Sequence, residues 1–256
     1  MISQSQLSAL AHQLKTNEAT VYREYLQVLF LSKFYARVTG DIYFKGGTAI
    51  HLIFAAPRFS EDLDFSVTCS ESKFKFLVEP VFSEIMREAP VTFKQRQTIA
   101  GERYLLTSRT PVVRSAAFIN LDFSFREAVF DPDKSIIDTV YPVLFTSFIH
   151  HLSAKEILAE KIRAILIRKK GRDIYDLWYL LSQGVVVDKQ LVLEKLKYYK
   201  KDKADLEGLR GRVAEFSERD FVQDLRPFVA LGERDKLGRL FAYTRQYLAE
   251  KLPRQL

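Results

Sequence analysis

Apolar residues recur at helix-like spacing at both ends of the chain, and short apolar runs separated by turn residues fill the middle. Leu7, Leu10 and Leu14 begin the first helical region, which extends from residue 3 to about 39. From about residue 152 onward the chain again reads as helices. The strand signals fall between these regions, at residues 42–45, 62–68, 91–98, 102–108 and 117–125.

The order of these elements predicts the α+β class, with a small mixed sheet between helical regions. The strands on either side of Ala100 and Gly101 are expected to pair as an antiparallel hairpin. We find no internal repeat. Three parts are expected: an N-terminal helical arm over residues 1–40, a sheet core over 41–150 and a helical C-terminal subdomain over 151–256.

Composition favours an intracellular protein. The chain has 256 residues, 47% of them hydrophobic, which is enough to bury a large core. Cys69 is the single cysteine, so an internal disulfide is excluded and a disulfide-stapled secreted scaffold is not expected. The N-terminus lacks the pattern of a signal peptide. No apolar stretch approaches the roughly 20 residues that span a bilayer. We therefore expect a cytoplasmic protein without a membrane partner.

The charge is unevenly distributed. From Lys161 onward there are 22 Lys and Arg against 14 Asp and Glu, whereas the preceding residues carry 17 and 18. A basic C-terminal half fits a nucleic-acid partner, since Lys and Arg neutralise phosphates and release counterions. An ordinary basic helical surface is an equally good explanation of the charge alone. The candidate RNA contacts are Lys195, Lys197, Lys200, Lys201 and Arg210.

A glycine turn follows the first predicted strand. Residues 42–44 form that strand, and a helix is expected over 49–54. Between them, Gly46 and Gly47 allow backbone angles closed to other residues. A strand, a glycine turn and a helix start direct backbone N–H groups toward one point, which attracts phosphate above other ligands. Gly46, Gly47 and Thr48 are therefore candidate phosphate-binding residues.

A pair of carboxylates, Asp62 and Asp64, follows this turn. Side chains alternate between the two faces of a strand, so both carboxylates share one face while Leu63 and Phe65 take the other. Such a pair can share Mg²⁺, which prefers oxygen ligands and keeps water and substrate phosphates in its shell. Each short motif alone is more often an ordinary turn or polar alternation. Their order and close spacing favour chemistry on a nucleoside triphosphate.

A third acidic residue, Asp122, lies in the strand predicted over residues 117–125. It shares a face with Asn120 and Ser124, whereas Leu121 and Phe123 take the opposite face. Asp122 is either a further metal ligand or base, or part of a solvent-facing polar edge.

The C-terminal half holds a second group of candidate residues. The capping-box sequence at 153–156 predicts a helix from Ala154. Lys161 lies four residues from both Ile157 and Ile165, within the apolar column of that helix. A lysine there either extends its ammonium outward to solvent or meets a buried anion.

Another helix is expected after Gly171, with Asp173 as its N-cap. Asp176 is either an acid of the first turn favoured by the helix dipole or a member of the site.

Both motif blocks resemble one family. Gly-Gly-Thr-Ala at 46–49, followed by Arg-x-Ser-x-Asp-Leu-Asp-Phe at 58–65, is similar to the AbiEii-type nucleotidyltransferase toxins. These belong to the DNA polymerase β-like nucleotidyltransferase superfamily. The string at 160–177 is similar to the motifs that follow the sheet in AbiEii-type proteins. The resemblance covers roughly residues 42 to 181, and it implies a nucleotidyltransferase core sheet.

The resemblance implies a metal-dependent nucleotidyltransferase (EC 2.7.7-type) that acts as the toxin of a type IV toxin–antitoxin system. The acceptor it implies is the 3′ end of tRNA, modification of which blocks translation, and the partner it implies is a cognate antitoxin. The helical C-terminal subdomain is expected to complete the active site. The implied residues are Asp62, Asp64, Lys161 and Asp176 for catalysis, Gly46, Gly47, Thr48, Ser60 and Lys161 for the nucleoside triphosphate, and Asp62, Asp64 and Asp122 for Mg²⁺ or Mn²⁺.

Two alternatives remain open. The same site could transfer a nucleotidyl or phosphoryl group to a protein or a small molecule. The chain could also be a non-catalytic nucleotide-binding module. Retention of four charged site residues together argues against the second alternative, because an inactive site does not need them.

Overall fold

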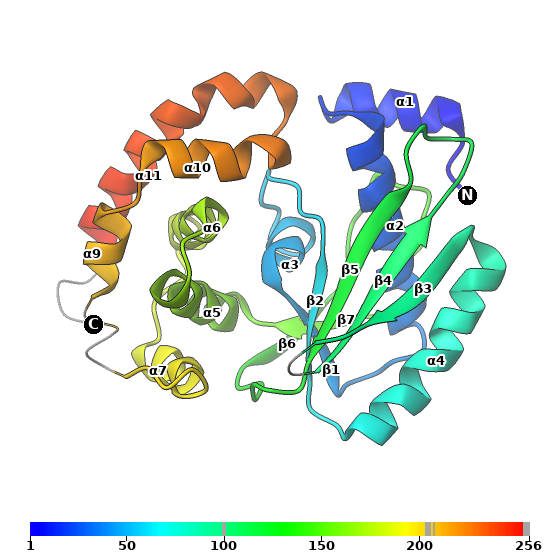
Figure 1. The fold of residues 1–256 in the computed structure, drawn as a ribbon, viewed down its shortest axis with the longest axis horizontal. Helices are drawn as coiled ribbons and strands as arrows, with labels where there is room; N and C mark the ends of the chain where they lie inside the picture. Colours follow the sequence, from blue (N-terminus) through cyan, green and yellow to red (C-terminus); the bar gives the residue numbers. More distant parts are fainter. Residues whose placement is uncertain (99–100, 203–205, 207, 253–256) are drawn as a thin grey trace. The chain divides into compact units, whose positions relative to one another are not determined.

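The computed structural model describes residues 1–98, 101–202, 206 and 208–252, and its architecture combines helices with a mixed sheet, as the sequence predicts. The chain divides into two compact units, Met1–Leu152 and Ser153–Leu256. The described strands all belong to the first unit, and the described part of the second is built from helices (Figure 1).

The first unit opens with two helices, α1 (Gln4–Gln13) and α2 (Glu18–Tyr35), where the sequence predicts one helical region. They separate before Asn17, whose side chain accepts a hydrogen bond from the Thr20 amide at 2.8 Å and caps α2. The remaining elements are β1 (Ile42–Lys45), α3 (Gly46–Leu52), β2 (Leu63–Val67), α4 (Glu71–Glu88), β3 (Val91–Arg96), β4 (Glu102–Ser108), β5 (Ala117–Ser124), β6 (Pro132–Ser135) and β7 (Ile149–Leu152).

The described strands form one sheet in the order β3-β4-β5-β2-β1-β7-β6. β2 runs parallel to β5 and β1 runs parallel to β7, whereas the other neighbours are antiparallel, so the sheet is mixed. The expected hairpin is present as β3 and β4, with Val91 paired to Ser108. Ala100 of its predicted turn lies outside the described residues.

Three elements of this unit are absent from the sequence-based prediction. α4 contains Pro80 in its interior, which argues against a helix, but it buries an apolar face that includes Phe74, Phe82 and Ile85. β6 and β7 have four residues each, and β6 is largely exposed. Such short strands do not show enough alternation to be recognised, and they form because β7 pairs with β1.

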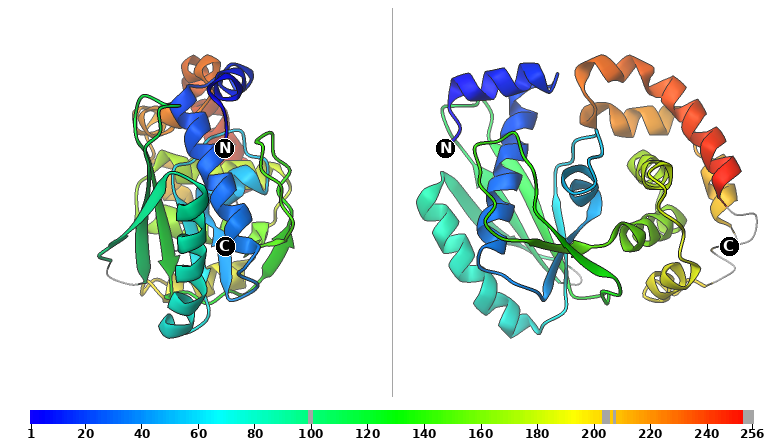
Figure 2. Two further views of the ribbon diagram at one scale, coloured as in Figure 1. Left: turned by 90° about the vertical axis from the view of Figure 1, so that its right-hand side faces the viewer. Right: turned by 180° about the vertical axis from the view of Figure 1, so that it is seen from behind.

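Helices α2 and α4 lie side by side against one face of the sheet (Figure 2). Buried aromatic side chains form the core between these helices and the sheet. Phe65 of β2 and Phe123 of β5 stack with their ring centroids 4.7 Å apart, and the ring of Phe34 on α2 lies 5.5 Å from that of Phe65. Because side chains alternate along a strand, the opposite face of β2 and β5 carries Asp64 and Asp122. Burial of the aromatic face therefore determines which way the carboxylates point.

The second unit begins at α5, whose N-cap is Ser153; its hydroxyl accepts a hydrogen bond from the Glu156 amide at 3.2 Å, and the helix starts at Ala154 as predicted. α5 packs against α6 and α7, and α6 packs against α10 and α11. No helix in the described part of the chain is both long and apolar enough to cross a bilayer. The α-helices are α5 (Ala154–Ile167), α6 (Gly171–Ser182), α7 (Lys189–Lys197), α9 (Leu209–Ala214), α10 (Glu218–Leu225) and α11 (Leu237–Lys251), with short 3₁₀ turns at Arg226–Phe228 and Leu231–Lys236.

Candidate active site

The pairing of β2 with β5 sets two carboxylates in register. The strands are parallel neighbours, and Asp64 lies directly opposite Asp122. Asp62 immediately precedes β2 instead of lying within it. All three aspartates are partly buried, and Leu63 between the first two is fully buried. The structure therefore brings Asp64 and Asp122 together on one face of the sheet, with Asp62 at the start of the strand.

Asp62 is fixed through its side chain and its backbone. Asn120 Nδ2 donates to Asp62 Oδ1 at 2.9 Å, and the Thr48 hydroxyl donates to the Asp62 carbonyl oxygen. The Thr48 bond joins α3 to the start of β2. Asn120 is not among the predicted site residues, but its position two residues before Asp122, on the same strand face, is a signal already present in the sequence.

The glycine turn lies directly against the carboxylate pair. α3 begins at Gly46 and ends at Leu52, so the glycines form its first turn, whereas the sequence predicts a helix over 49–54. Gly46 has a φ of 79°, a backbone conformation that side chains make costly. A Cβ at this position would lie 2.2 Å from Asp64 Oδ2. Glycine is therefore what allows the backbone to approach the carboxylate this closely.

Arg58 lies against the second glycine of the turn. A Cβ on Gly47 would lie 2.5 Å from Arg58 Nη2 and 3.1 Å from Ser60 Oγ. Arg58 is 2% exposed, and its Nη1 donates to the Phe59 carbonyl at 3.1 Å. Ser60 thus lies beside the turn, where the sequence predicts a nucleotide contact. Arg58 places a buried positive charge there; it opens the Arg-x-Ser-x-Asp motif but is not among the predicted site residues.

Asp122 has a cationic partner within the sheet. Arg103, opposite it on β4, donates from Nε to Asp122 Oδ1 at 2.8 Å. This hydrogen bond is the main cause of the raised pKa of the Arg103 guanidinium. The third predicted carboxylate therefore lies on the expected face, with one of its oxygens engaged by Arg103.

Asp62 and Asp64 are carboxylates of the kind that bind Mg²⁺ together with the phosphates of a substrate. Among the described residues, no group of three or more His, Cys, Asp or Glu side chains is placed to hold a metal. Mg²⁺ in nucleotide sites is usually bound by one or two carboxylates with water and substrate phosphates, instead of an all-protein cage. Asp62 and Asp64 offer suitable hard oxygen ligands, and the absence of a side chain on Gly46 leaves room at Asp64 Oδ2. These residues fit Mg²⁺ or Mn²⁺ in that form.

In the second unit, Lys161 meets buried anions. It is 8% exposed, and its Nζ lies 2.7 Å from Asp176 Oδ2 and 3.2 Å from Asp173 Oδ1. Arg168 makes two further hydrogen bonds to Asp173, at 2.7 and 3.0 Å. Of the two outcomes expected for a lysine in an apolar column, the buried anion is the one found. The structure thus brings together Lys161 and Asp176, two of the predicted catalytic residues.

Asp173 is not the N-cap of α6, so that prediction was wrong. The helix begins at Gly171 and its cap, Lys170, makes no side-chain capping hydrogen bond. Asp173 instead lies in the first turn and is 1% exposed. Burial alone would raise the pKa of Asp173, but the charges and hydrogen bonds of Lys161 and Arg168 lower it to about 2. Tertiary ion pairing, which a local motif does not reveal, determines its role.

Lys195 is completely buried, so its prediction as an RNA contact was wrong. Its Nζ lies 2.6 Å from Glu156 Oε1 and 3.3 Å from Glu160 Oε1, both on α5. A count of charges along the sequence does not distinguish this lysine from its neighbours Lys197 and Lys200, which are exposed.

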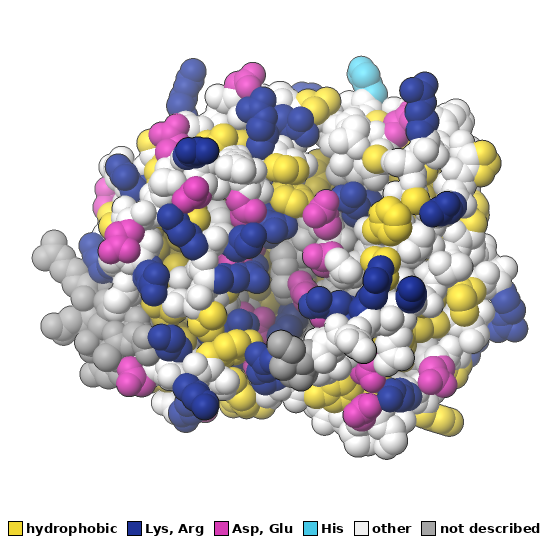
Figure 3. Space-filling view, in the orientation of Figure 1, with side chains coloured by type: hydrophobic (Ala, Val, Ile, Leu, Met, Phe, Trp, Pro, Cys, Tyr) yellow, Lys and Arg dark blue, Asp and Glu magenta, His cyan; other side chains and the backbone are white. Residues whose placement is uncertain are grey.

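Basic side chains are spread over the face of the second unit shown in Figure 3, where they alternate with acidic ones. Lys201 is partly buried. Arg210 donates to the backbone carbonyls of Leu252 and Ala249 and so attaches α9 to the end of α11. Of the predicted RNA contacts, Lys197 and Lys200 are therefore the most accessible.

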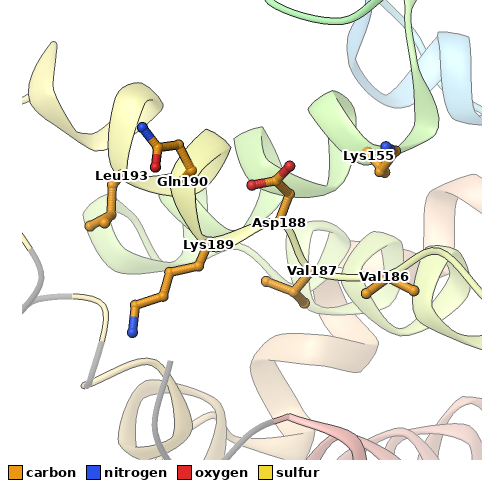
Figure 4. A pocket seen from close by; sticks show the side chains of 7 residues that line it. All are labelled: Lys155, Val186, Val187, Asp188, Lys189, Gln190 and Leu193. Carbon is orange, nitrogen blue, oxygen red and sulfur yellow. The ribbon is translucent and has the colours of Figure 1, made fainter.

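A cavity of about 720 Å³ in the second unit lies apart from these residues. Figure 4 shows Lys155 and Lys189 at its two sides, with Asp188 between them. Asp188 caps α7 by accepting from the Leu191 amide at 3.0 Å. None of the predicted site residues lines this cavity, whose walls are Lys155, Val186, Val187, Asp188, Lys189, Gln190 and Leu193.

Comparison with solved structures identifies similar folds. The chain resembles MenT4, a nucleotidyltransferase toxin from Mycobacterium tuberculosis, with a TM-score of 0.66 and 19% identity over 97% of this chain and 94% of that one. It also resembles JHP933 from Helicobacter pylori, with a TM-score of 0.58 and 19% identity over 92% and 94% of the two chains. No curated protein matches the sequence.

A family profile provides the assignment. The profile described as "Nucleotidyl transferase AbiEii toxin, Type IV TA system" matches residues 31–248, which include the glycine turn, the aspartate pair and the Lys161 cluster. This range covers most of both units. The chain therefore belongs to the AbiEii family of nucleotidyltransferase toxins of type IV toxin–antitoxin systems.

Proposed function

We propose that this toxin transfers a nucleotide from a nucleoside triphosphate to the 3′ end of tRNA, in a reaction that depends on Mg²⁺ or Mn²⁺ and blocks translation. The contact between Gly46 and Asp64 is the observation that carries the proposal. It brings a turn with backbone N–H donors against a carboxylate with the ligand chemistry of a hard cation. A fold that served only to bind RNA would have no need of this contact.

In the proposed reaction, a terminal hydroxyl oxygen of the RNA forms a bond to the α-phosphorus of the nucleotide. The bond from that phosphorus to the oxygen bridging the β-phosphate breaks, and pyrophosphate leaves with the electron pair. The proton of the hydroxyl passes to a carboxylate, and Asp122 is our candidate because it lies opposite Asp64 on the same face of the sheet. A bound divalent cation supplies neutralisation of the triphosphate charge.

The donor site is assigned to the first unit. Asp62 and Asp64 would hold the cation, since both are partly buried carboxylates at the start of β2. Gly46, Gly47 and Thr48 would orient the phosphates through the first turn of α3. Ser60 would contribute its hydroxyl, which lies against Gly47.

For Lys161 we propose neutralisation of nucleotide phosphate, with Asp176 as the residue that positions its ammonium group. Lysine carries a compact charge on a flexible stem, so a fixed partner is needed to hold it in one place. Asp176 is fully buried and lies 2.7 Å from Lys161 Nζ. A carboxylate with no exposed surface is better suited to this positioning role than to proton exchange with an acceptor.

The acceptor is assigned to RNA on the basis of charge. The basic excess falls from Lys161 onward, and Lys197 and Lys200 are exposed. MenT4, whose fold is similar, is described as a nucleotidyltransferase toxin. Membership of a type IV toxin–antitoxin family also implies a cognate antitoxin.

The test is Asp64→Ala, assayed with each labelled nucleoside triphosphate, total tRNA and, in parallel, total protein as acceptor. We expect wild-type protein to label tRNA only when a divalent cation is present. The variant should be slower by more than about 100-fold, since residues that merely orient metal ligands already contribute about 10–100-fold. It should remain folded, because Leu63 and Phe65 still anchor β2.

Asp133→Ala on β6 is the matched control, since Asp133 is an exposed strand aspartate in the same unit. It should transfer nucleotides at the wild-type rate. Full activity in folded Asp64→Ala would contradict the metal assignment, and transfer that survives chelation would do the same. Label recovered in protein and not in RNA would show that the acceptor is a protein and not tRNA.

A further inference from the structure

His51, in the last turn of α3, has an oxygen acceptor at each of its ring nitrogens. Nδ1 lies 2.5 Å from the carbonyl oxygen of Ala56, and Nε2 lies 2.9 Å from Oε2 of Glu24 on α2. The His51 side chain is 15% exposed and the Glu24 side chain 10%. The imidazole therefore connects α3 with the loop that follows it and with α2.

These two contacts indicate the protonation state of the ring. A carbonyl oxygen only accepts hydrogen bonds, so Nδ1 carries a proton. A carboxylate also accepts, so a proton on Nε2 completes an imidazolium paired with Glu24. Burial alone would lower the pKa of His51. The hydrogen bond and charge of Glu24, together with the Ala56 carbonyl, outweigh burial and raise it above its ordinary value.

Neither Arg58 nor Tyr141 takes the place of Glu24 as the group that raises the pKa of His51. Arg58, in the loop after α3, acts in the opposite direction and lowers the pKa of His51 by charge repulsion. Tyr141 lies near Glu24; burial first, and then the Glu24 charge, raise its phenol pKa far above the ordinary value, so it stays neutral. Phe59 covers the imidazole, with the ring centroids 5.6 Å apart. Glu24 is thus the group that contributes most to raising the pKa of His51.

α3 depends on such contacts for its position. It has only seven residues, and an isolated helix of this length is unstable in water. Its first turn contains Gly46 and Gly47, and its last turn contains His51. A positive charge near a helix C-terminus also interacts favourably with the helix dipole. Release of the C-terminal end of α3 would therefore allow the glycine turn to shift.

We propose that His51 is a positioning residue of the nucleotide site, an imidazolium that holds α3, and with it the Gly46–Gly47 turn, against α2. The inference rests on the proposed function, because that function assigns the nucleotide phosphates to this turn. Loss of the Nε2 proton removes the hydrogen bond to Glu24. Nucleotide affinity should then decrease as the pH rises through the pKa of His51.

Three variants test the inference. His51→Gln removes the charge and one of the two donors, and Glu24→Gln removes the anion while keeping its shape. His12→Gln, at an exposed histidine of α1, is the control. KM for the nucleotide and kcat are measured from about pH 6 to about pH 9, the range around the imidazole titration. The pKa of His51 is measured separately, by NMR of the labelled imidazole.

At the lower pH, KM should rise about 10–100-fold in His51→Gln and Glu24→Gln, with a smaller change in kcat. KM of the wild-type protein should increase with pH, whereas that of His51→Gln should stay constant. The NMR pKa of His51 should fall in Glu24→Gln, because the charge of Glu24 is lost and a neutral amide oxygen replaces the carboxylate as acceptor. His12→Gln should match the wild-type protein throughout.

A His51 that is neutral over the whole range would overturn the inference, as would wild-type KM in folded His51→Gln. If the proposed function is wrong, the wild-type protein will bind no nucleoside triphosphate, and this result distinguishes that failure from failure of the His51 inference. In that case the NMR titration and the hydrogen-exchange protection of α3 amides in His51→Gln still decide whether His51 holds the helix. Unchanged protection would refute the positioning role.

Discussion

Replacement of Gly46 by alanine tests the contact between the glycine turn and the carboxylate pair. Two effects follow from the structure. The residue has a φ of 79°, which costs an L-residue roughly 1–2 kcal/mol. The new Cβ would also lie 2.2 Å from Asp64 Oδ2, whereas ordinary contact begins at 3.4 Å. The Asp64 carboxylate must therefore retreat by roughly 1 Å, the difference between these distances.

The backbone strain should appear mainly in the melting temperature, and the displacement of the Asp64 carboxylate mainly in the rate of nucleotide transfer. Strain of roughly 1–2 kcal/mol should lower Tm by a few degrees, at ~2–4 °C per kcal/mol for a chain of this size. A misplacement of ~1 Å at a reacting group can lower the rate about 10²-fold. Gly46→Ala should therefore remain folded, with a slightly lower melting temperature and a rate of nucleotide transfer reduced by about two orders of magnitude.

Gly40→Ala is the matched control, because Gly40 has a φ of 73° and a Cβ there would meet nothing within 4 Å. Both variants carry the same type of backbone strain, so both should show a similar fall in Tm by scanning calorimetry. Only Gly46→Ala should lose transfer of labelled nucleotide at saturating tRNA. Equal transfer rates in the two variants would refute the reasoning, since displacement of Asp64 would then have no consequence for the chemistry.

Other perturbations test the second unit. Lys161→Ala should destabilise the protein by about 3–5 kcal/mol, since it leaves two buried aspartates without their ammonium partner, and a thermal melt within a degree of the wild type would contradict this. Asp173 has a pKa lowered to about 2, so its contribution to stability is present above about pH 4 and is lost as the pH falls toward 2; Asp173→Asn should flatten that part of an acid-unfolding profile. Lys195→Met should lower Tm without changing RNA affinity in the protein that remains folded, because the side chain is buried. Charge reversal at Lys197 and Lys200 should weaken tRNA binding and reduce the slope of log affinity against log salt concentration by about one per lost contact. Transfer at the wild-type rate in moderate salt would indicate that the RNA binds elsewhere.

Local pattern was sufficient for the strands nearest the site. Residues 42–45 and 102–108 were predicted at their observed bounds, because apolar alternation between turn residues is a property of the segment itself. Alternation also predicted that Asp64 lies opposite the apolar face of its strand and Asp122 opposite that of its own, but only the pairing of β2 with β5 sets these two carboxylates side by side. Local pattern did not predict α4, because Pro80 weighs against a helix unless the packing of this segment on α2 is known.

Partners of charged residues could not be predicted in this way. Asp173 looks locally like a helix cap, but its carboxylate pairs with Lys161 and Arg168. Lys195 is indistinguishable in sequence from the exposed lysines near it, and only its position opposite two glutamates of α5 shows that it is buried. Such pairings depend on how helices pack, and packing brings together residues that no short window contains.

The sequence by itself determined the class of fold, the glycine turn, the aspartate pair and the resemblance that identified the family, because each of these is encoded in neighbouring residues. Only the tertiary structure decided that Gly46 lies against Asp64 and that His51 is held by Glu24. It also decided that Arg103 engages Asp122. The physical reason is the cost of burying a charge: a group removed from water requires a partner, and the fold supplies that partner from distant parts of the chain.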